Sequence, residues 1–309
     1  MPTVSEIASL EEAAELLRDA AARGATVSIG REGGDVVLST HGFERILEHE
    51  PGDFTCTVEA GVRLADLNAR LAEHGQLFAL DPPGNPTLGA CVAANLSGPR
   101  RHRYGTARDL VLGVTVVLAD GTIASAGGKV VKNVAGYDLG KLFCGSEGRL
   151  GLIARLALRL HSRPDSARTL AVPVESPADA QAKALAILGS PLAPCALDVH
   201  WPGRLALLFE GGERSVERQL ETARALVGGA EAGAELWEEA AARQQAARGR
   251  LFFSPGALAA TLDGLDQAVV RVAAGVAYVP EPQPDPRDES ELRLAERVRQ
   301  QLDPAGTLA

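Results

Sequence analysis

The sequence predicts an α+β protein with a larger domain over residues 1–163 and a smaller one over residues 164–309. Three observations lead to this prediction. The length of 309 residues is enough for two domains. Segments with helical spacing of apolar residues alternate with segments of period-two spacing. Pro164 follows the longest period-two segment and marks a plausible boundary.

The first helix is predicted from its two ends. Ser9-x-x-Glu12 is a capping box, Gly24 is a typical helix stop, and the residues between them are amphipathic. The following elements alternate, and they are predicted as a strand at 26–29, a glycine-rich turn at 30–35, a strand at 36–39, a strand within 54–61 and a helix within 62–75.

The next strands are predicted from a turn and from strict alternation. Asp120-Gly121 separates two apolar runs, which predicts a β-hairpin over residues 110–127. Leucine and alanine occupy every second position from Leu150 to Leu160, so this segment is predicted as a strand although its composition suits a helix. Arginines and Ile153 are expected on its other side.

The C-terminal half is predicted as a β-α-β-β-α unit, similar to half of a split βαβ domain. After it come an alanine-rich helix, two strands, a proline-rich acidic linker and a final helix. Their predicted positions are residues 234–248, 268–272, 275–279, 280–290 and 291–302.

Composition excludes several classes of protein. The formal charge is −9 and aromatic residues make up 4%, which argues against nucleic-acid binding. None of the four cysteines forms a CxxC pair, so no iron–sulfur cluster, structural zinc or other metal site is expected within this chain. Scattered cysteines, the lack of a secretory signal and the lack of a membrane span indicate a cytoplasmic protein.

The segment TLGACVAANLSGPRRHRYG, residues 87–105, combines small residues with a cationic cluster. Small residues allow backbone N–H groups to approach a ligand, and arginines add charge-assisted hydrogen bonds. A pyrophosphate-containing cofactor would suit both halves. The alternative is a tightly packed helix followed by solvated arginines.

Two further segments carry candidate chemistry. GSEGRLG, residues 145–151, has the spacing G-x-x-G-x-x-G, which differs from the dinucleotide fingerprint and leads into a strand, so an ordinary turn is the alternative. KVVKNVAGYDLGKLFCG, residues 129–145, holds lysines that could face an anion or belong to a solvated loop.

Together, VEAGVRLADLN, residues 87–113, residues 119–153 and AGVAYV resemble the FAD-binding domain of the p-cresol methylhydroxylase and vanillyl-alcohol oxidase type. That fold has two α+β subdomains followed by a smaller α+β cap domain. The likeness covers most of residues 25–162. SGPRR and KNVAGYDL point to the small FAD-binding subunit of bacterial glycolate oxidase, also called glycolate dehydrogenase.

The resemblance implies a set of cofactor-binding residues in three segments. They are Gly30, Arg31, Gly33 and Gly34 in the first turn; Thr87, Leu88, Gly89, Ala90, Ala93, Ser97, Gly98 and Arg103 in the second segment; and Glu147, Gly148, Gly151 and Ile153 in the third. Glu32 and Asp35 are departures from the glycine-richer first turn of relatives. Relatives with covalent flavin use a histidine in this turn, which has none here, so noncovalent FAD is expected.

The reaction implied is oxidation of glycolate, a 2-hydroxy acid, to glyoxylate. Catalytic relatives place histidines in their C-terminal half, whereas no histidine follows His200 here. The chain is therefore expected to bind flavin without necessarily housing the oxidation site. Lys132 and Tyr137 are the speculative catalytic candidates, with structural roles as the alternative.

The resemblance also implies partners: a larger FAD-binding catalytic subunit and an iron–sulfur subunit. Through these partner subunits the chain would be peripheral at the inner membrane. Two other interpretations remain. One is a self-sufficient flavin oxidoreductase acting on another 2-hydroxy acid. The other is a scaffold subunit that has lost flavin.

Overall fold

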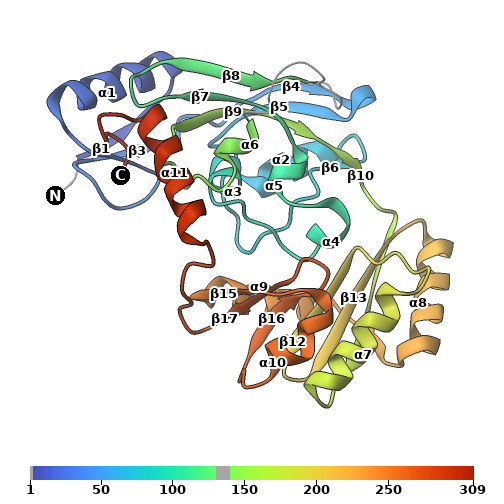
Figure 1. The fold of residues 1–309 in the computed structure, drawn as a ribbon. Helices are drawn as coiled ribbons and strands as arrows, with labels where there is room; N and C mark the ends of the chain where they lie inside the picture. Colours follow the sequence, from blue (N-terminus) through green and yellow to red (C-terminus); the bar gives the residue numbers. More distant parts are fainter. Residues whose placement is uncertain (1–2, 130–139) are drawn as a thin grey trace.

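The computed structural model describes residues 3–129 and 140–309, which form an upper and a lower part in Figure 1. The upper part is built mainly from residues before 163, and the lower part from residues 166–279. The lower part has a hydrophobic core of its own, formed between Leu170 and Val279. The upper part has two hydrophobic cores, one formed between Cys56 and Leu160 and one formed between Ile7 and Ala154 together with Leu308.

The first subdomain of the upper part packs α1 (Leu10–Arg23) against a parallel sheet. The strand order is β1 (Thr3–Glu6), β3 (Val36–Ser39) and β2 (Val27–Ile29). The Ser9 hydroxyl accepts the Glu12 amide at 3.1 Å, and the Glu12 carboxylate accepts the Ala8 amide at 2.8 Å. Gly24 ends the helix with a φ of 65°. The predicted N-cap at Ser9 and the helix stop at Gly24 are confirmed, whereas the capping box is incomplete because the Glu12 carboxylate bonds the amide of Ala8 and not that of Ser9.

The second subdomain is centred on a five-stranded antiparallel sheet. Its order is β4 (Ile46–Glu50), β5 (Thr55–Glu59), β9 (Leu152–Arg159), β7 (Val111–Val117) and β8 (Ile123–Gly127). The predicted strand from period-two leucines is the central strand β9. A register shift between the pairs Thr115–Arg155 and Val116–Ile153 changes which side chains share a face. Ile153 therefore joins Leu156 and Leu158 in one core, which corrects its expected place on the polar side.

Short elements fill the space between this sheet and the lower part (Figure 1). They are α2 (Leu64–Ala72), α3 (Leu88–Ala93), α4 (Arg101–Tyr104), α5 (Ala107–Leu110) and α6 (Gly140–Phe143), with the paired strands β6 (Gln76–Leu77) and β10 (His161–Ser162).

The lower part, called the cap here, contains a seven-stranded antiparallel sheet. Its order is β14 (Ala230–Ala232), β11 (Ser166–Pro173), β13 (Arg204–Gly211), β12 (Ala196–Trp201), β16 (Ala268–Arg271), β17 (Val276–Val279) and β15 (Gly249–Phe252). The helices α7 (Pro177–Leu188) and α8 (Glu213–Val227) pack their apolar residues into the core on one face. The predicted β-α-β-β-α unit is β11, α7, β12, β13 and α8.

The other face of the cap sheet is polar and is partly covered by α9 (Glu235–Ala246). Along β12, Leu197 and Val199 belong to the core, whereas Asp198 and His200 alternate with them. His200 contacts Trp237 of α9 edge to face, with ring centroids 5.6 Å apart. This lies within the usual separation of about 4.5–7 Å for such pairs. This alternation places buried polar groups toward the upper part.

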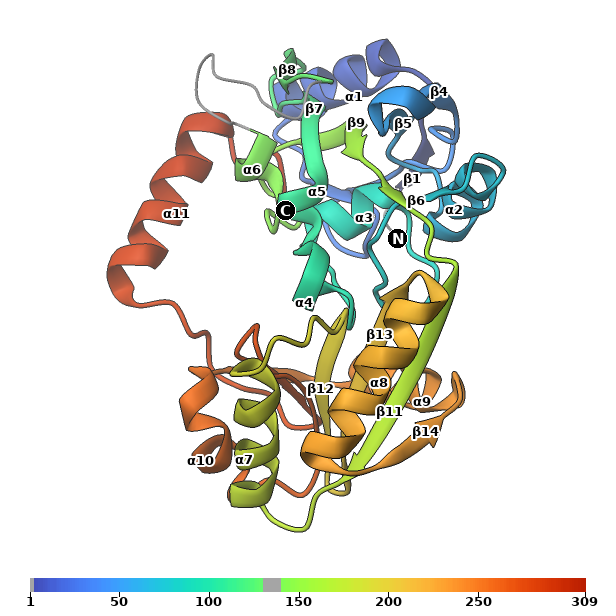
Figure 2. The same ribbon diagram turned by 90° about the vertical axis from the view of Figure 1, so that its right-hand side faces the viewer.

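The final helix α11 (Glu289–Leu302) leads from the cap back to the upper part (Figure 2). The Asp288 carboxylate caps it, accepting the amides of Ser290 and Glu291. Beyond it, the Val27 amide donates to the Thr307 carbonyl at 2.7 Å, and the Ala309 amide donates to the Val27 carbonyl at 2.9 Å. The last residues thus add to the edge of β2, in the upper part, although the sequence grouped them with the cap.

Candidate cofactor site

The glycine-rich turn between β2 and β3 has a backbone that suits glycine. Gly30, Gly33 and Gly34 have φ values of 64°, 136° and 67°. A Cβ atom at Gly34 would lie 2.9 Å from the Thr26 carbonyl oxygen. The Asp35 carboxylate accepts the Thr26 amide at 2.8 Å and its hydroxyl at 2.9 Å, and these bonds lower the pKa of Asp35. Asp35 is therefore engaged at the base of the turn.

The tip of this turn offers backbone donors. Within the described part of the chain, the amides of Arg31, Glu32 and Gly33 donate no hydrogen bond, and all three residues are exposed. The Arg31 guanidinium contacts the Ala309 carbonyl oxygen. Successive unpaired N–H groups in a glycine-rich turn are a typical arrangement for binding an oxyanion such as phosphate.

The N-terminal amides of α3 are already bonded. Thr87 caps the helix by accepting the Ala90 amide at 3.2 Å. The Leu88 amide donates to Val62 at 2.9 Å, and the Gly89 amide donates to Ala60 at 2.7 Å. A Cβ at Gly89 would lie 2.9 Å from the Ala60 side chain, so glycine allows this close packing. In this structure the Gly89 amide is not an open phosphate donor.

The C-terminal end of α3 meets the third predicted segment. The Gly145 amide donates to Val92 at 3.0 Å, and the Glu147 amide donates to Ala93 at 2.8 Å. A Cβ at Gly148 would lie 3.3 Å from the Ile29 side chain, which directly precedes the first turn. The fold therefore brings all three predicted segments to one place. We call this place the cradle; it comprises residues 30–34, 93–95 and 145–148.

Two polar oxygen atoms in the cradle have no partner. The Oδ1 atom of Asn95 and the Oγ atom of Ser146 are both buried without a hydrogen bond in the described part of the chain. Asn95 and Glu147 also adopt left-handed backbone conformations, with φ values of 46° and 54°. Buried unpaired polar atoms and such backbone conformations cost free energy, and both are concentrated at binding sites.

Ser97 and Gly98 lie further along the same segment, against the cap. The Ser97 carbonyl accepts Nε2 of Gln244 from α9 at 2.9 Å, and its hydroxyl accepts Nη1 of Arg101 at 3.1 Å. A Cβ at Gly98 would lie 1.8 Å from the Asp81 carbonyl oxygen. Only glycine fits this position without moving the backbone.

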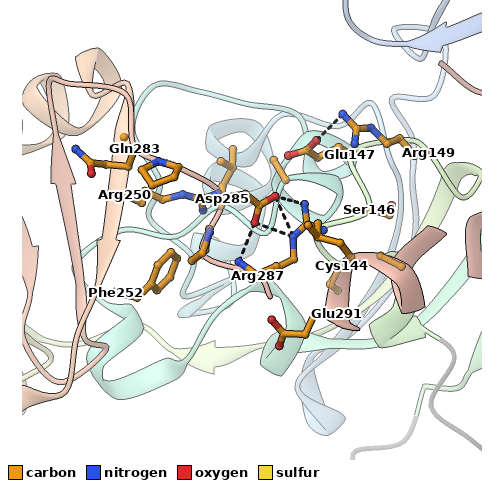
Figure 3. Close-up of a pocket in the computed structure, with 18 of the residues that line it drawn as sticks. Cys144, Ser146, Glu147, Arg149, Arg250, Phe252, Gln283, Asp285, Arg287 and Glu291 are labelled. Carbon is orange, nitrogen blue, oxygen red and sulfur yellow. Dashed lines mark hydrogen bonds and ion pairs between the residues drawn. The ribbon is translucent and has the colours of Figure 1, made fainter. Parts of the chain in front are cut away.

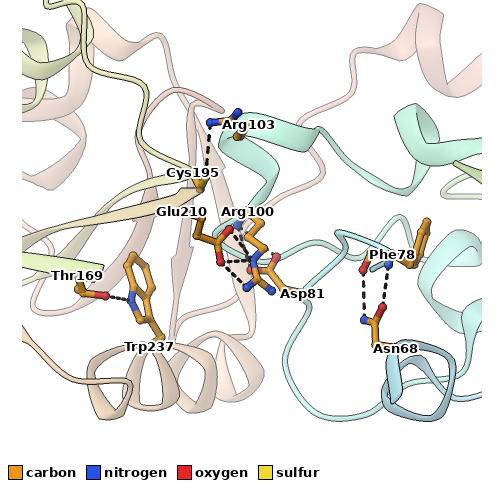
Figure 4. A network of polar contacts seen from close by, with 9 residues as sticks. All are labelled: Asn68, Phe78, Asp81, Arg100, Arg103, Thr169, Cys195, Glu210 and Trp237. Carbon is orange, nitrogen blue, oxygen red and sulfur yellow. Dashed lines mark hydrogen bonds and ion pairs between the residues drawn. The ribbon is translucent and has the colours of Figure 1, made fainter. Parts of the chain in front are cut away.

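The other predicted residues are less directly placed. Arg103 points toward the cap, with Nη1 at 3.9 Å from Sγ of Cys195 (Figure 4). Gly151 has a φ of 154° and leads into β9, where the Ile153 side chain is part of the core. Lys132 and Tyr137 lie outside the described residues.

A cleft of about 1320 Å³ opens between α11, β15 of the cap and the part of the cradle formed by Ala94 and residues 145–147 (Figure 3), whereas residues 30–34 do not line it. Ala94, Leu96 and residues 144–147 line it on the upper side. Arg250 and Phe252 line it from β15, and Leu294 lines it from α11. Ligand sites of about 300–1,000 Å³ accommodate drug-sized molecules, so this cleft is large enough for a dinucleotide.

The carboxylates that line the cleft all have partners. Glu147, Asp285 and Glu296 pair with Arg149, Arg287 and Arg299 at 3.5, 2.6 and 3.0 Å. The side-chain hydrogen bond from Arg287 lowers the pKa of Asp285 to about 2. Glu291 accepts the Asp288 amide at 3.0 Å. Among the described residues that line the cleft there is no histidine or lysine.

Sequence reasoning missed the residues that the cap contributes. Gln244, Arg250, Phe252 and Tyr278 all line the cleft. The strand β15 was not predicted, because its four residues have no clear period. Asn95 and Ser146 lay inside the segments that carried the resemblance, but a side chain without a partner is visible only in three dimensions.

The upper part is an FAD-binding domain. Residues 3–127 match the family model described as the FAD binding domain. FAD is thus the cofactor that this domain is built to hold, and the predicted cofactor class is confirmed.

Several curated relatives are FAD-linked or 2-hydroxy acid enzymes by name. The glycolate oxidase subunit GlcE of Escherichia coli (strain K12) is 32% identical over 214 residues, covering 68% of this chain and 59% of the relative. GlcD of Bacillus subtilis (strain 168) is 38% identical over 170 residues, covering 54% and 36%. A D-lactate dehydrogenase of Anaerostipes hadrus is 38% identical over 176 residues, covering 57% and 36%. The chain thus spans about a third to three fifths of the length of these relatives.

A solved structure shows the same fold over nearly the whole chain. Alkyldihydroxyacetonephosphate synthase superposes with a TM-score of 0.73 at 15% identity, covering 98% of this chain and 75% of the other. The likeness includes the cap, so the predicted fold class, an FAD-binding domain followed by a smaller α+β domain, is confirmed.

The residues present fit FAD. The turn tip supplies free N–H groups for phosphate oxygens, and Asn95 and Ser146 supply polar atoms that lack partners. The Asp35 carboxylate is held by Thr26 at the base of the turn, away from the free amides at the tip, and it stays ionised because these hydrogen bonds lower its pKa. The described residues hold no group of three or more His, Cys, Asp or Glu side chains that could bind a metal ion, and no described helix is long and apolar enough to cross a bilayer.

Proposed function

We propose that this chain is the FAD-binding subunit of a glycolate oxidase complex, also called glycolate dehydrogenase. In this proposal it takes part in oxidation of a 2-hydroxy acid, glycolate, to glyoxylate. Its FAD is held noncovalently and passes electrons on within the complex. The names of the GlcE and GlcD relatives support a multi-subunit oxidoreductase of this class.

The observation that carries the proposal is the cradle. Three segments that are far apart in the sequence lie close together there; one carries the free amides of residues 31–33, and the other two carry the unpaired buried oxygens of Asn95 and Ser146. A purely structural turn would have its polar atoms paired. When bound, FAD supplies the two-electron acceptor that oxidation of an alcohol to a carbonyl requires.

Each part of the cradle has a distinct proposed role. The amides of Arg31, Glu32 and Gly33 donate to phosphate oxygens, and Arg31 adds positive charge beside them. Asn95 and Ser146 hydrogen-bond polar atoms of the cofactor. Gly89 and Gly98 act indirectly, because they allow the α3 segment to pack closely against Ala60 and Asp81.

The cleft chemistry supports an electron-transferring role for this chain. Removal of the substrate hydroxyl proton needs a base with an accessible, unpaired site. The cleft carboxylates are engaged by arginines or by an amide, and the lowered pKa of Asp285 makes it a weak base. We therefore place proton removal in a larger FAD-binding catalytic subunit, with an iron–sulfur subunit as the next electron carrier. In this assembly the chain is cytoplasmic and meets the inner membrane through its partners.

The visible spectrum and turnover of the purified chain test the proposal. We expect flavin absorbance that acid or heat releases into solution, because the attachment is noncovalent. We expect no glycolate-dependent bleaching of the isolated chain, and bleaching when the chain is co-purified with its partner subunits. D-lactate is measured in parallel, because D-lactate dehydrogenases are among the relatives.

Each other outcome selects a different function. Turnover of glycolate or D-lactate by the isolated chain would indicate a self-sufficient oxidoreductase and contradict the subunit proposal. A purified complex whose small subunit neither contains nor binds FAD would indicate a scaffold. Flavin that stays with the protein after denaturation would contradict noncovalent attachment.

A further inference from the structure

The polar face of the cap sheet reaches the Ser97 segment through a chain of buried side chains. Asp198 of β12 pairs with Arg271 of β16, and both side chains are nearly inaccessible, at 1% and 2% exposure. Arg271 also donates to Oε1 of Gln244 on α9. Nε2 of Gln244 then donates to the Ser97 carbonyl at 2.9 Å.

The Gln244 amide is therefore oriented by two different groups. Its oxygen accepts from a guanidinium, so its nitrogen must point away from Arg271, toward the upper part. Arg271 is in turn held by Asp198, which leaves little freedom for the pair to rotate. Gln244 also lines the cleft, so it joins the cap core, the Ser97 backbone and the candidate cofactor space.

A second contact holds the same segment a few residues later. Nη2 of Arg100 pairs with the Glu210 carboxylate of β13 at 2.5 Å, and the Arg100 amide donates to Asp81 at 3.0 Å (Figure 4). Gly98 lies directly against Asp81. Ser97 is thus the point at which the segment leaves this anchored region and approaches the cleft, with Gln244 as its only cap partner among the described hydrogen bonds.

We propose that Gln244 is a positioning residue for cofactor binding, through which the cap sheet fixes the Ser97 backbone. The inference rests on the proposed function, because it assumes that residues 87–98 contact FAD. It adds that the FAD-binding domain does not set this segment alone. Asp198 and Arg271 act through Gln244, and none of the three needs to touch the cofactor.

Two substitutions separate this role from general support of the fold. Gln244→Glu keeps an oxygen for Arg271 but cannot donate to the Ser97 carbonyl when ionised. Gln244→Met keeps the length of the side chain and removes both hydrogen bonds. The matched control is Gln219→Ala on α8, because the Gln219 side chain also bonds a backbone group, accepting the Ala193 amide at 2.9 Å, and does not line the cleft.

The experiment measures FAD binding by the full chain, the visible spectrum of the bound flavin and the melting temperature without FAD. We expect Gln244→Glu to melt within a few degrees of the unsubstituted chain. We expect it to bind FAD about three- to tenfold more weakly, as for loss of one hydrogen bond, with a shifted flavin absorbance band. Gln244→Met should weaken binding at least as much, and Gln219→Ala should leave affinity and spectrum unchanged.

The outcomes distinguish a failure of the proposed function from a failure of the positioning role alone. If the unsubstituted chain fails to bind FAD, the proposed function and this inference both fail. If it binds FAD and Gln244→Glu binds with the same affinity and spectrum, only the positioning role is overturned. An equal loss of affinity in Gln219→Ala would also overturn it, because the effect would then reflect a general loss of cap structure.

Discussion

The ion pair between Arg100 and Glu210 joins the FAD-binding domain to the cap, and we predict that it stabilises the folded chain. The Glu210 side chain is 2% exposed and that of Arg100 is 29% exposed. Removing one partner of a fully buried pair costs about 3–5 kcal/mol, because the other charge remains unpaired. Arg100 retains contact with water. The Glu210 carboxylate, and the Asp81 carboxylate nearby, both raise the pKa of Arg100. We therefore expect Glu210→Ala to lower the free energy of unfolding by about 2 kcal/mol.

Urea and thermal unfolding of the purified chain measure this loss. A change of about 2 kcal/mol corresponds to a drop in melting temperature of about 4–8 °C for a chain of this size class. The control is Glu289→Ala, which breaks the Arg293–Glu289 pair on α11, where the side chains are 66% and 84% exposed. Exposed pairs contribute about 0–1 kcal/mol. A double-mutant cycle with Arg100→Ala should show coupling. A loss in Glu210→Ala no larger than that in Glu289→Ala would refute the reasoning.

Three further predictions concern pH, packing and affinity. Burial lowers the pKa of His200 to about 3, so the unfolded chain takes up a proton first and stability falls as pH drops from about 6.5. The free energy of unfolding, measured with urea, should therefore fall by roughly 2 kcal/mol less between about pH 7 and pH 4.5 in His200→Phe than in the unsubstituted chain. The same dependence of the free energy of unfolding on pH in both proteins would contradict this. Gly98→Ala places a Cβ 1.8 Å from the Asp81 carbonyl and should cost about 3 kcal/mol, whereas Gly52→Ala, which has open space, should melt like the unsubstituted chain. Ser146→Ala removes a buried unpaired hydroxyl, so the chain without FAD should melt at the same or a higher temperature while FAD affinity falls about three- to tenfold; unchanged affinity would remove Ser146 from the cradle.

Local signals were enough to predict much of the fold. Ser9, Glu12 and Gly24 define α1 because capping acts within a few residues. The alternating leucines of β9 predict a strand because a strand places every second side chain on the same face of its sheet. In the structure β9 pairs with β5 on one side and β7 on the other. The short strands β1, β4, β14 and β15 carry no such pattern, since edge strands are stabilised by pairing partners that are distant in the sequence.

The candidate site was predictable as a set of segments and less so as a set of contacts. The fold brings Gly148 against Ile29, next to the glycines of residues 30–34, and the contact of these glycines with FAD stays a prediction. Gly89 was expected to offer its amide to phosphate, and instead this amide bonds Ala60. Small residues predict that another group approaches the backbone closely. They do not show whether that group is a second protein segment or a ligand.

The contribution of the cap lay beyond local reasoning. Asp198, Arg271 and Gln244 are separated by 27 residues or more along the chain, and no motif connects them. The strand β12 was predicted as part of the β-α-β-β-α unit, without an assignment of its two faces. That its polar face would be buried against Ser97 follows only from the packing of the two domains.

Equilibrium titration of the cofactor-free chain with FAD tests the central claim most directly. Flavin fluorescence and calorimetry should show one saturable site per chain, and AMP or pyrophosphate should compete, because the cradle binds through phosphate and polar contacts. Saturable binding that Ser146→Ala and Gln244→Glu each weaken would support the cradle and its link to the cap. A correctly folded chain that shows no saturable binding in excess FAD would contradict the account.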